Sequence, residues 1–162
     1  MEQMVLGIGD MGATRSVGTV VKTYGLGSCV AIVMLDPKTR TIGMDHVALP
    51  DSTVDKKKAE RLPGYFADTG IPALLQRMTD MGCNPQGRGF IVKLIGGASM
   101  INADEVFNIG NRNVLAIKKI LWKYRMGATA EQLGGTISRT VQVEVATGKV
   151  LVTSPHLPKI YV

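Results

Sequence analysis

The sequence is poor in the residue types on which several common architectures depend. Among its 162 residues are two cysteines, Cys29 and Cys83, and two histidines. Neither cysteine belongs to a Cys-x-x-Cys pair or has a histidine at metal-ligand spacing, so we expect no metal site. Two isolated cysteines also argue against a disulfide scaffold. We expect both to be free thiols in a reducing compartment.

Long hydrophobic runs are also missing. The uninterrupted apolar run over residues 29–35 is far too short to cross a bilayer, and residues 1–5 lack the basic and apolar order of a signal peptide. We therefore expect a cytoplasmic protein without membrane insertion. With 45% hydrophobic and 20% charged residues, and no repeat or linker, the chain fits one globular domain over residues 1–162.

Acidic residues are outnumbered by basic ones, and the formal net charge is +6. The densest basic cluster, residues 56–58 with Arg61, lies in a polar, turn-rich stretch and is interrupted by Asp55 and Glu60. We interpret this stretch as a solvated mobile loop and expect no nucleic-acid binding. An acidic protein partner is compatible with the overall charge.

Hydrophobic periodicity predicts an α+β fold. Two helical patterns cover residues 69–82 and 111–125; Asp68 or Thr69 is expected to cap the first, Pro72 fits its first turn, and the basic residues of the second are expected on a solvated face. Apolar and β-branched runs predict strands at residues 5–8, 17–24, 28–35, 41–49, 88–95, 141–145 and 150–152. This order favours layered mixed β-sheets with helices packed on the outside.

A Gly-x-Gly-x-x-Gly motif spans residues 7–12 and is typical of dinucleotide sites. Such a site needs a helix directly after the motif, because the pyrophosphate binds at that helix N-terminus. Residues 13–24 instead have the pattern of a turn and a strand. We interpret the motif as a glycine-rich turn and expect no organic cofactor.

Cys29 stands in a different setting. Gly25 and Gly27 permit positive φ and a close approach of backbone to substrate, and a sharp bend here exposes the thiol with N–H groups near Ser28 aimed at an oxyanion. A free cysteine more often packs as a small hydrophobic residue. Residues 28–35 and 41–49, however, are expected to form a hairpin, which brings Cys29 near His46. That pairing favours a nucleophilic cysteine.

His46 is the candidate general acid and base for the Cys29 thiol, although an ordinary half-buried strand histidine is the alternative. A third group has to hold its ring in a productive tautomer, and Thr23 is our candidate, with Asp45 and Asp51 as rivals. His156 lies between prolines and is expected to be structural or exposed. Cys83 lies in a helix-stop sequence and is not expected to be catalytic.

The motifs taken together resemble the CheD family of chemoreceptor glutamine deamidases. Residues 23–29 read Thr-x-Gly-Leu-Gly-Ser-Cys, and residues 46–52 read His-Val-x-Leu-Pro-Asp-Ser. Residues 68–75 resemble the family's Asp-x-Ala-Ile-Pro-x-Leu segment, with Gly70 in place of the usual alanine, and residues 93–98 match its Lys-x-x-Gly-Gly-Ala. Segments 108–113 and 134–148 extend the likeness over nearly the whole chain.

The resemblance implies a fold shared with bacterial toxin deamidases, with Cys29 as nucleophile, His46 as general acid and base, and Thr23 as its positioning group. It implies methyl-accepting chemotaxis receptors as substrates, whose glutamines are converted to glutamate through a thioester, and the CheC phosphatase as a partner. Two alternatives stay open. The same site can cleave a glutamyl methyl ester, or the protein can act mainly as an adaptor that binds receptors and CheC.

Overall fold

The computed structural model describes residues 1–99 and 108–162, and the strands within these ranges form two five-stranded sheets. Sheet A has the order β1 (Glu2–Leu6), β3 (Thr19–Leu26), β8 (Arg139–Glu144), β9 (Val150–Thr153), β10 (Ile160–Tyr161). Sheet B has the order β2 (Met11–Thr14), β5 (Thr41–Val47), β4 (Val30–Asp36), β6 (Ile91–Gly96), β7 (Ala128–Leu133). Both sheets are mixed, because β1 runs parallel to β3 and β6 runs parallel to β7 while the other pairs are antiparallel.

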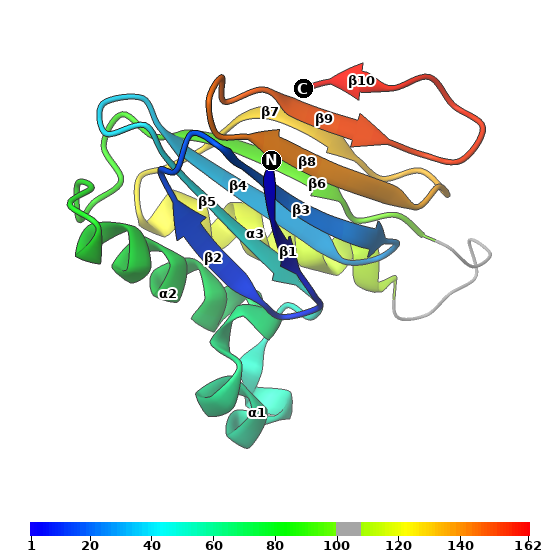
Figure 1. Cartoon of the computed structure of the whole chain (residues 1–162). Helices are drawn as coiled ribbons and strands as arrows, with labels where there is room; N and C mark the ends of the chain where they lie inside the picture. Colours follow the sequence, from blue (N-terminus) through cyan, green and yellow to red (C-terminus); the bar gives the residue numbers. More distant parts are fainter. Residues whose placement is uncertain (100–107) are drawn as a thin grey trace.

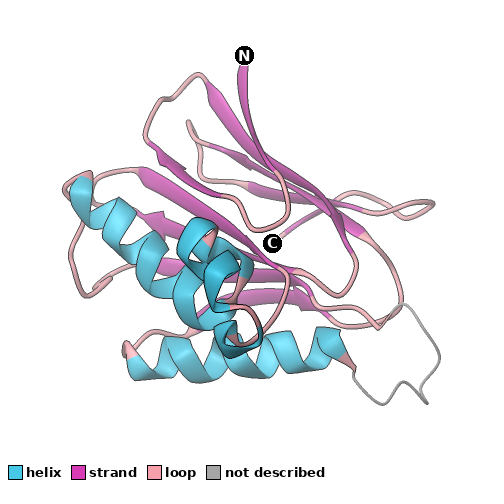
Figure 2. Cartoon of the chain, turned by 90° about the horizontal axis from the view of Figure 1, so that it is seen from below, coloured by secondary structure: helices cyan, strands magenta, loops and turns pink. Residues whose placement is uncertain are grey.

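The molecule has three layers, with sheet B in the middle (Figure 1). Sheet A packs on one face of sheet B. Helices α2 (Ala67–Asp80) and α3 (Ile109–Lys123) cover the other face, as the view from below shows (Figure 2). The short helix α1 (Lys56–Arg61) and two single 3-10 turns, Ser52–Val54 and Pro63–Tyr65, connect β5 to α2.

Strand β4 is buried along its whole length because it faces a hydrophobic core on each side. Val30, Ile32 and Met34 pack toward the helices, whereas Ala31 and Val33 pack toward sheet A. Successive side chains of a strand point to opposite faces, so a central strand covered on both sides needs a continuous apolar run. This burial explains the run that begins at Cys29 and places the odd-numbered side chains between the two sheets.

The predicted fold class is confirmed, and so is the hairpin. β4 and β5 pair in antiparallel register with Ala31 opposite His46. The glycine-rich motif of residues 7–12 ends within strand β2, not at the start of a helix, and Gly9 lies in a turn with φ of 83°. β2, β7 and β10 were not predicted, because they are short edge elements with weak apolar alternation.

Three local predictions were wrong. Residues 56–61 form helix α1, not a loop, because Asp55 accepts a hydrogen bond from the Lys58 N–H and caps the helix. Helix α2 begins two residues earlier than predicted, at Ala67, so Pro72 lies inside the helix and not in its first turn. Neither Asp68 nor Thr69 caps it: the Asp68 carboxylate accepts the Ser52 N–H and hydroxyl instead.

Candidate active site

Cys29 lies in a tight connection between the end of β3 and the start of β4. The pairing of β3 with β8 becomes irregular after Thr23, and Gly25 then adopts φ of 66°, which favours glycine. Gly27 has no positive φ, so only the first of the two predicted glycines is needed for a left-handed conformation. The Cys29 side chain is half-buried and packs against the core between the sheets.

A second glycine-rich segment, residues 96–98, is hydrogen-bonded to this connection through its backbone N–H groups. The Gly97 N–H donates to the Cys29 carbonyl and the Ala98 N–H donates to the Gly27 carbonyl, both at 2.8 Å. Gly96 has φ of 120°, and a Cβ there would lie 2.2 Å from the Cys29 carbonyl oxygen. The backbone therefore approaches Cys29 at a distance that only glycine allows.

His46 faces the same interior space as Cys29. Its partner across the hairpin is Ala31, which is two residues after Cys29 and points to the same face. Cys29 and His46 are thus diagonal neighbours, and such pairs in an antiparallel sheet have Cα atoms about 7–8 Å apart, within reach of long side chains. The imidazole is 1% exposed. The register therefore places both residues on the same face, and the Cys29–His46 pair itself stays a prediction.

Thr23 reaches His46 from the opposite sheet. The distance from Thr23 Oγ1 to His46 Nδ1 is 2.7 Å, and the Thr23 hydroxyl donates to the Leu6 carbonyl at 2.8 Å. Because the hydroxyl proton is already committed to Leu6, Nδ1 has to be the donor of its own bond. The neutral ring therefore carries its proton on Nδ1, and Nε2 presents the free lone pair that a general base needs.

The two rival orienting residues lie elsewhere. Asp45 precedes His46 on the strand, so its side chain points to the opposite face, toward Gly64 and Gly70. Asp51 is exposed and accepts the Thr53 N–H. Neither carboxylate contacts the imidazole, and of the three candidates the structure brings only Thr23 to His46.

Burial keeps both members of the Cys29–His46 pair uncharged. Desolvation lowers the pKa of His46 to about 4, and the nearby Asp10 carboxylate offsets only part of this effect. Desolvation raises the pKa of the Cys29 thiol, although its own backbone N–H acts in the opposite direction. Nε2 of His46 is buried and has no hydrogen-bond partner among residues 1–99 and 108–162. In this structure the thiol therefore does not donate to the ring.

Asn113, on helix α3, ties the two halves of the site together. Its side-chain N–H₂ donates to the carbonyl oxygens of Ser28 and Ala48, each at 3.0 Å, and its side chain is fully buried. Ser28 directly precedes the nucleophile candidate, and Ala48 follows the base candidate by two residues. Our sequence reasoning did not assign Asn113 a role; a polar residue on the apolar face of a predicted helix was the available signal.

Other candidates from the sequence stand apart from the site. His156 is exposed in a turn, and Cys83 is buried with its sulfur 3.4 Å from the Thr39 hydroxyl. Within the described ranges no cluster of three His, Cys, Asp or Glu side chains is arranged to hold a metal ion. In the same ranges, no helix is long and apolar enough to span a membrane.

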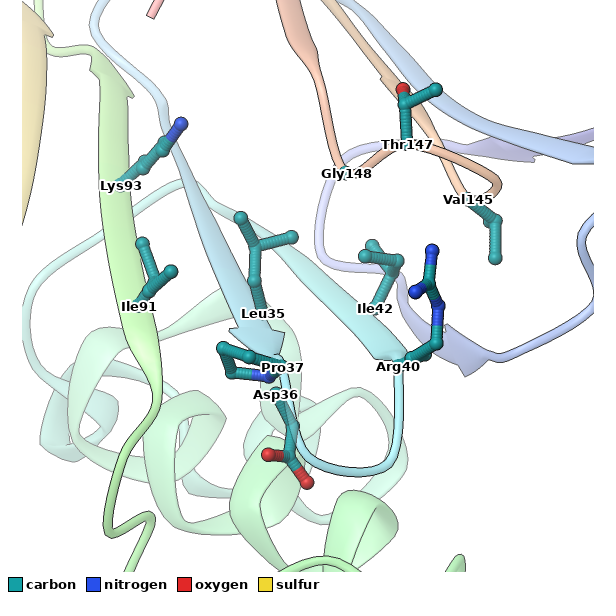
Figure 3. Close-up of a pocket in the computed structure, with 10 residues that line it drawn as sticks. All are labelled: Leu35, Asp36, Pro37, Arg40, Ile42, Ile91, Lys93, Val145, Thr147 and Gly148. Atoms are coloured by element: carbon teal, nitrogen blue, oxygen red, sulfur yellow. The ribbon is translucent and has the colours of Figure 1, made fainter.

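A hollow between the sheets lies at the other end of β4 and β5 from Cys29 (Figure 3). Arg40, one of the two cations that line it, donates to the Ala146 carbonyl at 2.9 Å, and the carboxylate of Asp36 accepts bonds from the Lys38 N–H and the Thr39 hydroxyl. These hydrogen bonds stabilise the β4–β5 turn and connect it to the β8–β9 turn. No cysteine or histidine is among the residues that line the hollow.

The matching family model and three similar proteins all carry the same family description. The family model described as CheD chemotactic sensory transduction matches residues 48–154. A protein of Syntrophotalea carbinolica named "Probable chemoreceptor glutamine deamidase CheD" is 50% identical over 155 residues, which is 96% of each chain. "Probable chemoreceptor glutamine deamidase CheD 1" of Syntrophus aciditrophicus is 40% identical over 98% of each chain. A similarly named protein of Solibacter usitatus is 44% identical over 92% of this chain and 87% of its own.

Proposed function

The chain belongs to the CheD family, and from that premise we propose that it is a protein-glutamine deamidase that converts glutamine side chains of chemoreceptors to glutamate. The observation that carries the proposal is the hydrogen bond from His46 to Thr23, which leaves Nε2 as a free base on the face that Cys29 shares. The relatives' names supply the substrate class. We take residues 1–162 as one deamidase domain, since both sheets contribute to this site, and we place it in the cytoplasm.

In the first step, Cys29 Sγ attacks the carbon of a glutamine carboxamide while Nε2 of His46 takes the thiol proton. The negative charge that develops on the amide oxygen is stabilised by backbone N–H groups near Ser28 and Cys29. We expect Gly25 and Gly27 to allow a close approach of the protein backbone to the substrate at this position. The Nδ1–H bond to Thr23 Oγ1 holds the ring while it becomes cationic.

In the second step, His46 returns the proton to the amide nitrogen, ammonia leaves, and a thioester joins the substrate to Cys29. His46 then takes a proton from water, whose oxygen attacks the thioester carbon and releases the thiol. One amide and one water give one carboxylate and one ammonium ion. The mechanism uses no metal and no organic cofactor.

The neutral resting pair suits this sequence of proton transfers. A buried imidazolium with a pKa of about 4 is a stronger acid than an ordinary imidazolium, so it readily donates its proton to the departing ammonia. The raised pKa of Cys29 keeps the thiol protonated until substrate arrives. Proton transfer from Cys29 to His46 is therefore uphill in the free protein, and bound substrate has to draw the two side chains together.

The decisive experiment is peptide mass spectrometry on receptor fragments from the same organism, incubated with the protein. We expect an increase of mass at specific glutamines that marks conversion to glutamate, and no conversion with Cys29→Ala. Glutamyl methyl esters are tested in parallel, because only the leaving group differs. Absence of any glutamine conversion, alongside retained binding to receptors or to a CheC phosphatase, would support the adaptor alternative and contradict the proposal. CheC itself is a partner that we propose from the family resemblance.

Thiol alkylation gives an independent prediction that needs no substrate. Because burial raises the pKa of Cys29, we expect slow alkylation by iodoacetamide at neutral pH and a rate that rises above the pH range of an ordinary cysteine. Mass spectrometry of tryptic peptides separates Cys29 from the buried Cys83. Fast alkylation of Cys29 at neutral pH would show a preformed thiolate and imidazolium, and would contradict the neutral-pair mechanism.

A further inference from the structure

The outer face of helix α3 carries two large apolar side chains that are exposed to solvent. Leu115 is 60% exposed and Trp122, the only tryptophan of the chain, is 81% exposed. They are seven residues apart and therefore lie on the same side of the helix. Ile117 and Leu121 occupy the opposite side and are fully buried against sheet B. Leu115 and Trp122 therefore do not take part in the packing of the helix against sheet B.

The same face is strongly basic. Residues 109–123 contain no Asp or Glu. Lys118 forms an ion pair with Glu131 at 2.7 Å. Lys119, Lys123 and Arg125, by contrast, make no side-chain hydrogen bond or ion pair within the part of the chain that the structure describes. We call Leu115, Lys119, Trp122, Lys123 and Arg125 the α3 outer surface.

The surface is hollowed at the C-terminal end of the helix. One depression is lined by Trp122, Lys123 and Arg125, with Met126 and Gly127 beside them. A second is lined by residues 85–90 and 123–127, which add Arg88, Phe90 and Tyr124 to its wall. Cations and aromatic rings therefore line the same two depressions.

We propose that the α3 outer surface binds an acidic segment of a partner protein that inserts an apolar side chain beside Trp122. Tryptophan, tyrosine and arginine are the residues that contribute most to protein interfaces when they surround a pocket. Carboxylates of the partner would pair with Lys119, Lys123 and Arg125, which have no acidic partner among the residues that the structure describes. A side chain of the size of leucine that packs against Trp122 removes apolar surface of both groups from water, which favours binding.

A protein segment suits this surface better than a membrane. Only Leu115 and Trp122 offer large apolar side chains on the outer face, and membrane-surface helices need a broad apolar face. The depressions are concave, whereas a bilayer is flat at this scale.

The α3 outer surface is separate from the candidate active site. Asn113, near the start of the helix, contacts the carbonyl of Ser28, but Trp122 lies nine residues further on. At 1.5 Å per residue this places Trp122 about 13 Å along the helix axis, on the face turned away from the sheet. The proposal does not depend on the deamidase function.

The fluorescence of Trp122 can report binding directly, because Trp122 is the only tryptophan in the sequence. We would titrate the protein with a glutamate-rich peptide that carries a central leucine, and with the same peptide in which serine replaces leucine. We expect a saturable change in Trp122 emission with the leucine peptide. The serine peptide should bind about tenfold more weakly, as the loss of one buried apolar side chain implies.

Charge reversal locates the binding. Lys123→Glu with Arg125→Glu should weaken binding of the leucine peptide at least about tenfold, whereas the matched reversal Lys56→Glu with Lys57→Glu on helix α1 should leave it within about twofold. Lys119→Glu is the second variant if the first pair unfolds, which circular dichroism would show. Equal weakening by the α1 reversal, or equal binding of the serine peptide, would overturn the proposal. Tighter binding of anionic vesicles or of a single-stranded oligonucleotide, with the same change in Trp122 emission, would overturn it in favour of that ligand class.

Discussion

Thr23 shows how one oxygen atom can select the reactive form of a histidine. It donates to Leu6 and accepts from Nδ1 of His46, so its single proton decides which ring nitrogen is free. Sequence reasoning identified Thr23 as one of three orienting candidates. It could not exclude Asp45 and Asp51, because the choice depends on which face of a strand each side chain occupies.

We predict that Thr23→Val lowers kcat for glutamine conversion by about a hundredfold, the order of a general acid-base contribution. Valine has nearly the same shape but leaves Nδ1 without an acceptor, so the ring loses its fixed tautomer. Thr23→Ser keeps the hydroxyl and should retain most of the activity. Nitrogen chemical shifts of the His46 ring, measured by NMR, report the tautomer directly. An unchanged tautomer in Thr23→Val would contradict the positioning role.

Asp45 and Gly70 form a second residue-level pair. A Cβ at Gly70 would lie 2.3 Å from Asp45 Oδ2, and both carboxylate oxygens of Asp45 lack a hydrogen-bond partner within the described residues. The family resemblance places alanine at position 70, so glycine here accommodates the buried acid on the neighbouring strand. The sequence showed the substitution but not its reason, which is a contact between β5 and α2.

The effect of Gly70→Ala should therefore change sign with the residue at position 45. In the natural chain we expect it to destabilise the fold by about 1–3 kcal/mol, because the new methyl group overlaps Asp45. In an Asp45→Ala background, the same change should stabilise the fold by up to about 1 kcal/mol, since alanine is the better helix former. Urea unfolding of the natural chain, the two single variants and the double variant gives the coupling energy. Additive effects would show that the overlap is relieved elsewhere.

At the level of whole elements, helix α3 links core packing to the geometry of the site. Its apolar side packs against sheet B through Ile117 and Leu121, and one turn earlier Asn113 bridges the segments that carry Cys29 and His46. Helical periodicity predicted the helix and its buried side. It gave no indication that a buried polar residue would donate to two carbonyl oxygens of loops from distant parts of the chain.

We predict that Asn113→Ala lowers kcat by about 10- to 100-fold with little change in KM, because a small displacement of reacting groups is costly. Ile117→Ala, one turn further along the same face, is the control for lost packing and should destabilise the fold by about 2–5 kcal/mol without this loss of kcat. Steady-state kinetics well below both melting temperatures separates the two effects. Equal kcat in the two variants would show that Asn113 is only a packing residue.

For the molecule as a whole, the sequence predicted the central strands and the two long helices better than it predicted the edge strands of the sheets. The β4–β5 hairpin and both long helices follow from strong local patterns, and the hairpin register places Cys29 and His46 on the same face. β2 and β7 are the edge strands of sheet B. Short edge segments such as Met11–Thr14 carry little apolar signal. The pairing of sheet A with sheet B brings Thr23 to His46, and such packing between distant segments cannot be read from periodicity.

The two buried titratable groups on β5 should shape stability against pH in opposite senses. His46 has a folded pKa of about 4 against an ordinary 6.5, so between these values the unfolded chain binds the additional proton and stability rises with pH. Burial raises the pKa of Asp45 well above 3.8, and the Arg77 charge offsets only part of this. Above 3.8 the folded protein therefore holds the additional proton, and stability falls as pH rises.

From a pH of about 4 upward the two contributions act in opposite directions. Above a pH of about 6.5 the His46 contribution is constant, because the ring is then neutral in both states. Urea unfolding of Asp45→Ala against pH should consequently show a free energy of unfolding that rises relative to the natural chain from pH about 4 upward. The lost side chain adds an offset that is independent of pH, so the slope of the difference is the measurement. A difference that stays flat over this range would show that Asp45 is ionised in the folded protein.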